Sequence, residues 1–287
     1  MSDDIARDEL VVEKPAPEDE RLWGVTTLLK VARGTGPGLE YWGKEQVAKA
    51  ALKGQSTVAA MLREQGEAAA LKWLMDAPYR RPKDSTYTNA ERGTAVHRAC
   101  ETYAKTGERP EVDDEVAPYL NQFEKWLVRF QPVTYEAAEM TVYSRRYSYA
   151  GTCDAFMWID GHLFIVDYKT AAKSYDAKGN PTTPYPEAVL QLAAYAHAEF
   201  AAAWRVRRFE QFYRRYYLLG EDELDAKVEI PKAEAGLVIH IAPEHCEAYP
   251  VPVDDDMFNA FLDHLEVARF TLDTSKDFFR EPLVAPS

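Results

Sequence analysis

Cysteine is scarce in this chain of 287 residues, which contains only Cys100, Cys153 and Cys246. The three are far apart and none belongs to a CxxC pair, so the sequence indicates neither a disulfide framework nor a structural zinc site. The chain also lacks a run of about eighteen apolar residues, so we expect no membrane-spanning helix and no membrane partner. It begins without a basic segment followed by an apolar one, the pattern of a secretory signal. We therefore expect a protein of the reducing cytoplasm.

Positive charge is in the minority, because 34 Lys and Arg face 47 Asp and Glu and give a net charge of -13. This balance argues against adhesion to nucleic acid through a generally basic surface. A locally bound divalent cation would offset the acidity, so a nucleic-acid-binding protein is not excluded. Part of the excess lies in residues 1–22, where eight acids accompany three bases. Apolar residues there show almost no periodicity, and we expect a disordered acidic tail.

Helical spacing of apolar residues dominates the first half of the chain. It predicts helices over much of residues 23–79, interrupted by GTGPG and KGQS, and then a polar loop over residues 80–88. Further helices are predicted from Asn89 to a C-terminal cap at Gly107, and over residues 113–130. We therefore divide the chain into the tail, an N-terminal helical region at 23–88 and a core at 89–287.

Strand patterns dominate the second half. They occupy residues 139–147, 151–159, 162–170, 236–241 and 246–251. Pro186 is well placed to open a long helix over residues 187–204, and a last helix is predicted at 256–270. This order of elements predicts an α/β or α+β fold, in which helices flank a mixed β-sheet.

Residues 204–217, WRVRRFEQFYRRYY, interleave basic and aromatic side chains. The aromatic residues follow helical spacing, at Phe209, Phe212, Tyr213 and Tyr216. On such a helix the arginines point outward, at Arg207, Arg214 and Arg215. We expect a helix with its aromatic stripe in the core and a solvated charged rim. A surface that tracks phosphates or stacks bases is the alternative, and the pairs Arg80/Arg81 and Arg145/Arg146 are further candidates for phosphate contacts.

Asp160 and Gly161 join two alternating apolar runs, which predicts a two-residue type I′ hairpin. Counting outward from this turn places Asp154 opposite Asp167. Because side chains alternate along a strand, the two carboxylates share a face, with Cβ atoms about 5 Å apart, where like charges repel. A shared proton, an arginine or a divalent metal would relieve that repulsion. A one-residue bulge would shift the register.

Lys169 lies two residues beyond Asp167 and projects from the same face of the predicted hairpin. Two carboxylates and an adjacent amine are what metal-assisted phosphodiester hydrolysis needs, since the acids hold the metal and the amine acts on water or on phosphate charge. The alternative is a surface hairpin with solvated ends, in which Lys169 only neutralises one aspartate.

The segment GTCDAFMWIDGHLFIVDYKT resembles the core of the PD-(D/E)XK nuclease superfamily, in its RecB-like branch. Upstream, RGTAVHRACE is similar to the helix that carries the histidine ligand of that family. Downstream, QLAAY matches its QxxxY helix. These elements stand in the family's order between residues 92 and 195. The C-terminal part, from GLVIHIAPEHCEAYPV onward, is similar to phage and actinobacterial members.

The resemblance implies a restriction-endonuclease-like core and a metal-dependent deoxyribonuclease. Exonuclease activity is favoured because this branch mostly acts in recombination and end processing. The implied cofactor is Mg²⁺, with Mn²⁺ able to substitute, and the implied partners are DNA and a recombination or single-strand annealing protein. The resemblance implies that the metal is held by His97, Asp154, Asp167 and the backbone carbonyl of Tyr168. It implies that Lys169 acts in catalysis together with the two aspartates. It also implies that Gln191 and Tyr195 bind DNA.

Some members of the branch hold an iron–sulfur cluster through four cysteines, which this chain cannot supply, so no cluster is expected. Glu101, one turn beyond His97, and Glu139 are candidates for a supporting or second-metal role, with solvated glutamates as the alternative. Two other functions stay open. One is a non-catalytic nucleic-acid-binding accessory protein that retains the nuclease fold. The other is an unrelated metal-binding structural domain, which leaves Lys169 and QLAAY unexplained.

Overall fold

The computed structural model describes residues 19–34, 37–81, 85–202, 208–211 and 214–274. The chain divides into two compact units. Arg33–Ala95 form one of them, which we call the helical unit, and the residues before and after it form the core unit.

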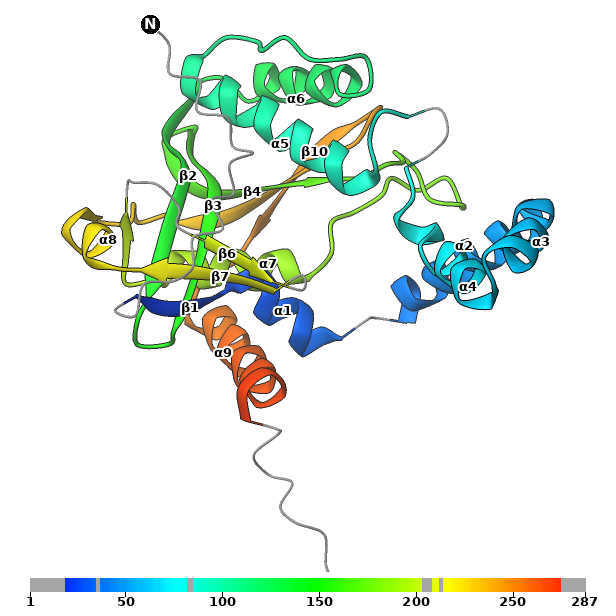
Figure 1. Ribbon diagram of the computed structural model, residues 1–287. Coiled ribbons are helices and arrows are strands. Elements are labelled where there is room, and N and C mark those ends of the chain that lie inside the picture. Colours follow the sequence, from blue (N-terminus) through cyan, green and yellow to red (C-terminus); the bar gives the residue numbers. More distant parts are fainter. Residues whose placement is uncertain (1–18, 35–36, 82–84, 203–207, 212–213, 275–287) are drawn as a thin grey trace, which may run out of the picture. The chain divides into compact units, whose positions relative to one another are not determined.

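A mixed β-sheet organises the core unit (Figure 1). Its main path runs β10-β9-β4-β3-β1-β7-β6, while β2 pairs with β3 and β5, and β5 pairs with β8. The pairs β1–β3 and β4–β9 are parallel, and the others are antiparallel. The strands are β1 Glu20–Gly24, β2 Val133–Ser144, β3 Tyr149–Ile159, β4 His162–Thr170, β5 Phe200–Ala202, β6 Arg208–Gln211, β7 Arg214–Leu219, β8 Lys227–Val228, β9 Ala235–Ile241 and β10 Cys246–Val251.

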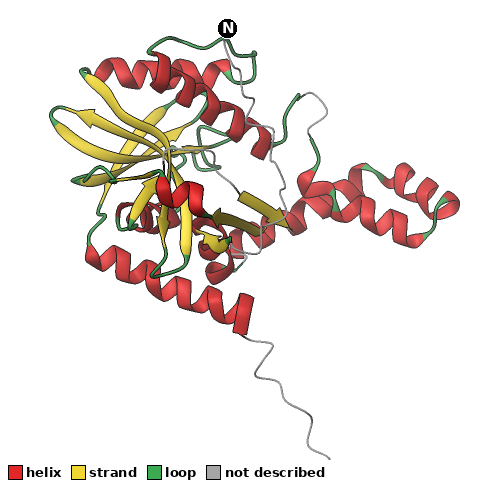
Figure 2. Cartoon of the chain, turned by 60° about the vertical axis from the view of Figure 1, so that its left-hand side comes forward, coloured by secondary structure: helices red, strands yellow, loops and turns green. Residues whose placement is uncertain are grey.

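Helices flank this sheet, as Figure 2 shows, which confirms the predicted fold class. They are α1 Val25–Arg33, α5 Asn89–Thr106, α6 Ala117–Arg129, α7 Glu187–Ala196, α8 Glu221–Asp225 and α9 Asp255–Arg269, which continues into a π-helical turn, Phe270–Thr274. On β4, Tyr168 packs edge-on against Phe123 of α6, whereas the preceding Asp167 bonds to Gln191 of α7. Since neighbouring strand residues point to opposite faces, α6 and α7 cover opposite faces of the sheet. None of the described helices combines the length and apolar character that crossing a lipid bilayer needs.

Each face of the sheet has its own apolar layer. Leu192 of α7 and Phe261 of α9 are fully buried in one cluster with Phe156 of β3. On the face covered by α6, Phe123 stacks on Trp126, and both rings are buried. Burying a side chain of this kind contributes about 1.5–3 kcal/mol. The strands that carry the candidate site residues are thus held from both sides.

The Asp-Gly hairpin forms in the predicted register. Asp160 and Gly161 both have positive φ, 50° and 81°, as a type I′ turn requires. Phe156 pairs with Ile165, and Ala155 with Val166. The regular β3–β4 ladder ends there, one residue before the two aspartates.

The predicted helix over residues 187–204 is wrong in its second half. Helix α7 ends at Ala196, and Phe200–Ala202 form β5 between β2 and β8. All three residues of β5 are buried. The helix propensity of the alanines is a weak preference, and burial between two strands overrides it.

The predicted helix over residues 204–217 is also wrong, because Arg208–Gln211 and Arg214–Leu219 form the antiparallel pair β6–β7. Phe212, Tyr213 and Arg207 lie outside the described residues. Strand β7 pairs with β1, which had no sequence signal and which includes Glu20–Leu22 of the predicted acidic tail. Leu22 is fully buried there. Pairing with a distant segment, which periodicity does not encode, decides both elements.

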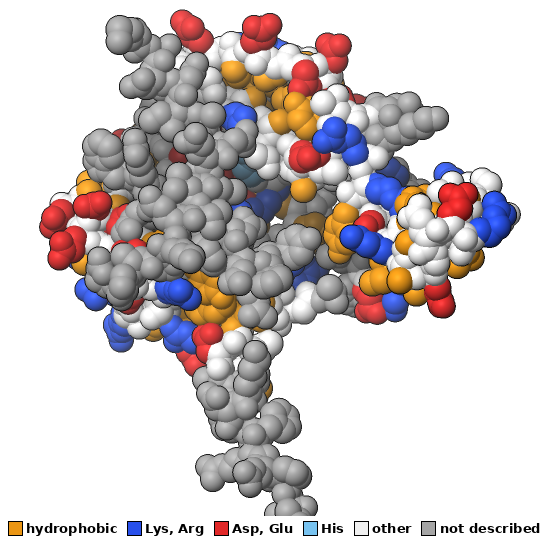
Figure 3. Space-filling view, in the orientation of Figure 1, with side chains coloured by type: hydrophobic (Ala, Val, Ile, Leu, Met, Phe, Trp, Pro, Cys, Tyr) orange, Lys and Arg blue, Asp and Glu red, His pale blue; other side chains and the backbone are white. Residues whose placement is uncertain are grey.

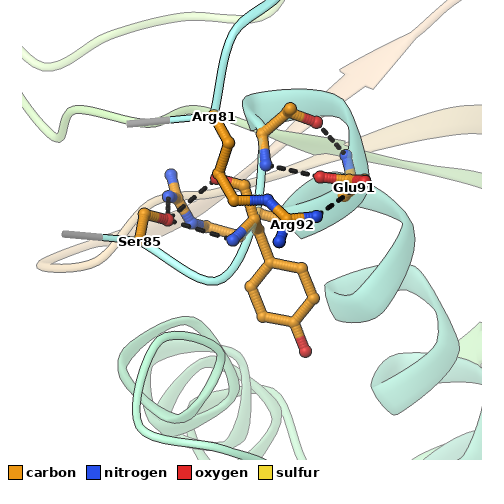
Figure 4. Close-up of polar contacts among 6 residues, drawn as sticks. Arg81, Ser85, Glu91 and Arg92 are labelled. Carbon is orange, nitrogen blue, oxygen red and sulfur yellow. Dashed lines mark hydrogen bonds and ion pairs between the residues drawn. The ribbon is translucent and has the colours of Figure 1, made fainter. Parts of the chain in front are cut away.

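The helical unit contains α2 Pro37–Lys53, α3 Gln55–Glu64, α4 Glu67–Met75 and the 3₁₀ turn η1 Ala77–Tyr79. The start of α5 belongs to it as well. There the Glu91 amide donates to the Thr88 hydroxyl and the Thr88 amide to the Glu91 carboxylate, a capping box (Figure 4). Figure 4 also shows Arg81 paired with Glu91, and Arg92 donating to the Ser85 hydroxyl. The predicted start of this helix at Asn89 is confirmed, as is its end before Gly107, which has φ 71°.

Candidate active site

The two aspartates lie where β3 and β4 separate. The Asp154 carboxylate accepts a hydrogen bond of 2.7 Å from the Tyr168 backbone amide, so β4 itself positions this acid. Asp167 is almost completely buried, at 2% exposure. Burial raises the pKa of Asp167, and the Asp154 charge adds to this while Lys169 opposes it. The structure thus brings together the two carboxylates that the hairpin count places side by side.

Lys169 forms an ion pair with Asp167, the buried acid of this pair. Its Nζ lies 2.5 Å from Asp167 Oδ2, and its side chain keeps 31% exposure while that of Asp167 keeps 3%. The amine therefore stands between a buried carboxylate and solvent. The sequence placed it on the same face as Asp167, and the structure agrees.

Gln191 of α7 joins the lysine and the buried acid. Its amide nitrogen donates to Asp167 Oδ1 at 2.8 Å, and its amide oxygen accepts from Lys169 Nζ at 3.1 Å. The same nitrogen lies 3.1 Å from the Tyr195 hydroxyl, one turn along the helix. One amide thus sets the positions of both charged groups.

Tyr195 lies behind this amide. Its side chain is buried, at 2% exposure, and its ring packs against Gly151 of β3, where a Cβ would come within 2.3 Å of the ring. Buried in this way, the ring offers almost no surface for the DNA contact that the resemblance implies, and that role of Tyr195 stays a prediction. The structure makes it a support for Gln191.

His97 approaches the pair from α5. Its Nδ1 lies 3.5 Å from Asp154 Oδ1, and its ring packs edge-on against Tyr168. Burial by itself lowers the pKa of His97, but the Asp154 carboxylate outweighs it and the net direction is upward. Correspondingly, burial raises and His97 lowers the pKa of Asp154, with a downward net result. The buried Val96, Ala99 and Cys100 fix the face of α5 that carries His97.

The two glutamates singled out from the sequence are placed differently from each other. Glu101 is nearly buried and pairs with Lys105 at 2.5 Å. Glu139 lies within β2, between residues that pair with Ala155 and Cys153, so its backbone is opposite Asp154. Its φ of 55° is left-handed, which costs a non-glycine residue about 1 kcal/mol or more.

His240 of β9 was not identified from the sequence. It is paired in register with Lys169, is 3% exposed, and lies 5.8 Å from His245 between ring centroids. Burial, and secondarily His245, lower the pKa of His240 to about 4. The parallel pairing of β4 with β9 brings it here, and no local sequence pattern encodes that pairing.

The donor types of this site suit a divalent cation. Carboxylates are the ligands that Mg²⁺ prefers, and a site that adds an imidazole also accommodates Mn²⁺. Two adjacent acids of which one has a raised pKa would also gain from a cation between them. In the described residues, no group of three or more His, Cys, Asp or Glu side chains is arranged to hold a metal ion. Gln191 donates a hydrogen bond to Asp167 Oδ1, and Lys169 forms an ion pair with Oδ2.

Comparison with known proteins does not assign a family. No protein-family model matches the chain, and no curated protein matches it. Among solved structures, the crystal structure of SSO0001 aligns with a TM-score of 0.33 and 13% sequence identity, covering 91% of this chain and 79% of that one. We base no argument on a likeness of this size.

Proposed function

We propose that this chain is a metal-dependent deoxyribonuclease of the PD-(D/E)XK superfamily, RecB-like branch. It would act as an exonuclease that hydrolyses phosphodiester bonds in DNA recombination, repair or end processing. The observation that carries the proposal is the convergence of Asp154, Asp167 and Lys169 at the open end of the β3–β4 hairpin. His97 and Gln191 border these groups from α5 and α7.

The residues that would hold Mg²⁺ or Mn²⁺ are His97, Asp154, Asp167 and the backbone carbonyl of Tyr168. A bound ion of this kind lowers the pKa of water and polarises a phosphate group. The contribution of the chain is to hold two acids close together at a considerable electrostatic cost. Burial contributes most to the raised pKa of Asp167, and the charge of Asp154 adds to it.

Lys169 supplies the positive charge that a phosphoryl transition state needs. Its amine is held by Gln191 on one side and Asp167 on the other, and its partial exposure leaves it open to a substrate phosphate. Gln191 restricts the lysine, so that less ordering is needed when the substrate binds.

The direct test uses purified protein with end-labelled linear DNA and covalently closed circular DNA, in Mg²⁺, Mn²⁺ or EDTA. We expect degradation of linear DNA with either metal and none in EDTA or on the circle. Binding without cutting in every condition would instead support the non-catalytic accessory protein. If the protein neither binds nor cuts DNA, the unrelated metal-binding structural domain is the interpretation that remains.

Lys169→Ala provides the matched residue test. It should reduce cleavage at least about 100-fold, because a preorganised charge at the reacting phosphate is lost. Thermal unfolding should show that the variant is folded. Lys125→Ala removes an exposed lysine of α6 and should cleave like the unmodified protein. Equal cleavage by the two variants would refute the role of Lys169.

A further inference from the structure

The helical unit has large side chains that its own helices do not cover. In α3 and α4, Ala70 is the one described residue that is buried. Met75 at the end of α4 and Tyr79 at the end of η1 are 68% and 79% exposed, and Leu52 of α2 is 71% exposed. Large apolar side chains, where they gather at a surface, mark an interaction site.

An ordered aromatic–arginine pair lies in this surface. The guanidinium of Arg80 stacks over the ring of Trp73, 3.8 Å from the ring centroid. The edge of the same ring lies against Gly54, where a Cβ would come within 2.5 Å of the indole. Because the ring is restrained by the α2–α3 junction, the guanidinium plane is held in a defined orientation.

The charge of the helical unit differs from that of the rest of the chain. Residues 33–95 contain ten Lys and Arg and seven Asp and Glu, a net of +3 in a chain of net charge -13. Residues 72–81 contain three basic residues, Lys72, Arg80 and Arg81, and a single acid, Asp76. Arg81 pairs with Glu91, while Lys72 and Arg80 have no ion pair among the described residues. Figure 3 shows Lys and Arg side chains beside hydrophobic ones on this unit.

We propose that the surface formed by Lys72, Trp73, Tyr79, Arg80 and Arg81 binds single-stranded nucleic acid. Tyr79 directly precedes Arg80 and Arg81, and an exposed ring beside cations is the combination that holds single strands, because a free base stacks on the ring while the cations contact phosphates. The bases of a duplex are already stacked and cannot use Tyr79. An acidic protein would pair with the cations but has no use for the stacked arrangement. The inference rests on the proposed function only in taking DNA as the polymer.

The test measures binding without cleavage. The full-length protein is titrated in EDTA into a fluorescent oligothymidylate of about 20 nucleotides, and its Kd is read by anisotropy. Tyr79→Ala and Arg80→Ala should each weaken binding about tenfold. Arg80→Lys keeps the charge and loses the planar stack, so it should also weaken binding. Each lost phosphate contact should lower the slope of log Kd against log salt by about 0.7.

Tyr41→Ala is the matched control. Tyr41 is 72% exposed, similar to Tyr79, and lies near the N-terminal end of α2, outside the proposed surface. It should bind within twofold of the unmodified protein. Circular dichroism and thermal unfolding should show all variants folded.

The proposal is overturned if Tyr79→Ala and Arg80→Ala bind like Tyr41→Ala, or if a duplex of equal length binds equally well and is equally affected. It is also overturned if the two variants change only the oligomeric state, which would assign the surface to a second copy of the chain. Variant-sensitive binding by a protein that cuts no DNA would support the surface and refute the nuclease. If the protein cuts DNA but the variants bind the oligonucleotide like the unmodified protein, the nuclease is supported and the proposed surface is refuted.

Discussion

At the scale of single residues, one amide organises the candidate site. Gln191 bonds Asp167, Lys169 and Tyr195 at once. Its neighbour Asp167 is almost completely buried, so losing a donor there leaves an oxygen without compensation. Gln191 is therefore a positioning residue whose loss acts through the acid and the lysine.

Gln191→Ala should lower the stability of the protein by about 1–3 kcal/mol, because Asp167 Oδ1 loses its hydrogen bond. If the proposed function holds, it should lower kcat more than it raises KM, since the lysine is no longer held. Tyr195→Phe keeps the ring packed and removes one weaker hydrogen bond, so its effects should be smaller. Urea unfolding and steady-state cleavage measure both effects. A variant that changes only KM would indicate direct DNA contact instead.

His240 makes the free energy of unfolding depend on pH. The pKa of His240 is lowered to about 4, whereas an unfolded histidine titrates near about 6.5. As pH falls through this window, the unfolded chain takes up a proton that the folded chain does not. The contribution of His240 to stability is therefore fully present above about pH 6.5 and declines toward pH 4, by up to about 3 kcal/mol.

His240→Gln should remove this decline. Urea unfolding at pH 7.0, 5.5 and 4.0 would show a smaller loss of stability with acid in the variant than in the unmodified protein. Parallel pH profiles for the two proteins would mean that His240 does not cause this pH dependence.

At the scale of elements, a close approach of α7 to β3 aligns the site. Gly151 allows the Tyr195 ring to lie against the strand backbone, which in turn places Gln191 above β4. A side chain at position 151 has no room, because Tyr195 is itself buried.

Gly151→Ala should therefore destabilise the protein by about 1–3 kcal/mol or more, as overpacking does in closely packed interiors. Gly43→Ala is the control, since Gly43 lies inside α2 and no atom outside its own helix backbone lies within 4 Å of its added Cβ. There alanine should stabilise by up to about 1 kcal/mol through helix propensity. Opposite shifts in Tm are expected, and destabilisation by both variants would contradict the packing argument.

At the scale of the whole molecule, the proposed metal site predicts linkage between ion binding and folding. A ligand that binds only the folded protein at 100 times its Kd adds about 2.7 kcal/mol. For a chain of this size that corresponds to a rise in Tm of roughly 4–5 °C.

Millimolar Mg²⁺ or Mn²⁺ should therefore raise the Tm of the unmodified protein and of Asp263→Asn, which alters an exposed acid of α9. The Tm of Asp154→Asn should not rise. Calorimetry at matched ionic strength measures the three. A similar rise in all of them would assign the effect to general screening of the net negative charge.

The sequence by itself determined what is local. The Asp-Gly turn requires positive φ at two positions, and alternation then sets the register that carries Asp154 and Asp167 to the end of the hairpin. It also determined α5 with His97, since caps and helical period are short-range signals. Only the tertiary structure decided the rest. Segments distant in the chain turn Phe200–Ala202 and Arg214–Leu219 into strands by pairing with them. Distant segments also bury Tyr195 and bring His240 beside Lys169. Strand pairing and burial depend on residues distant in the chain, which no window of sequence contains.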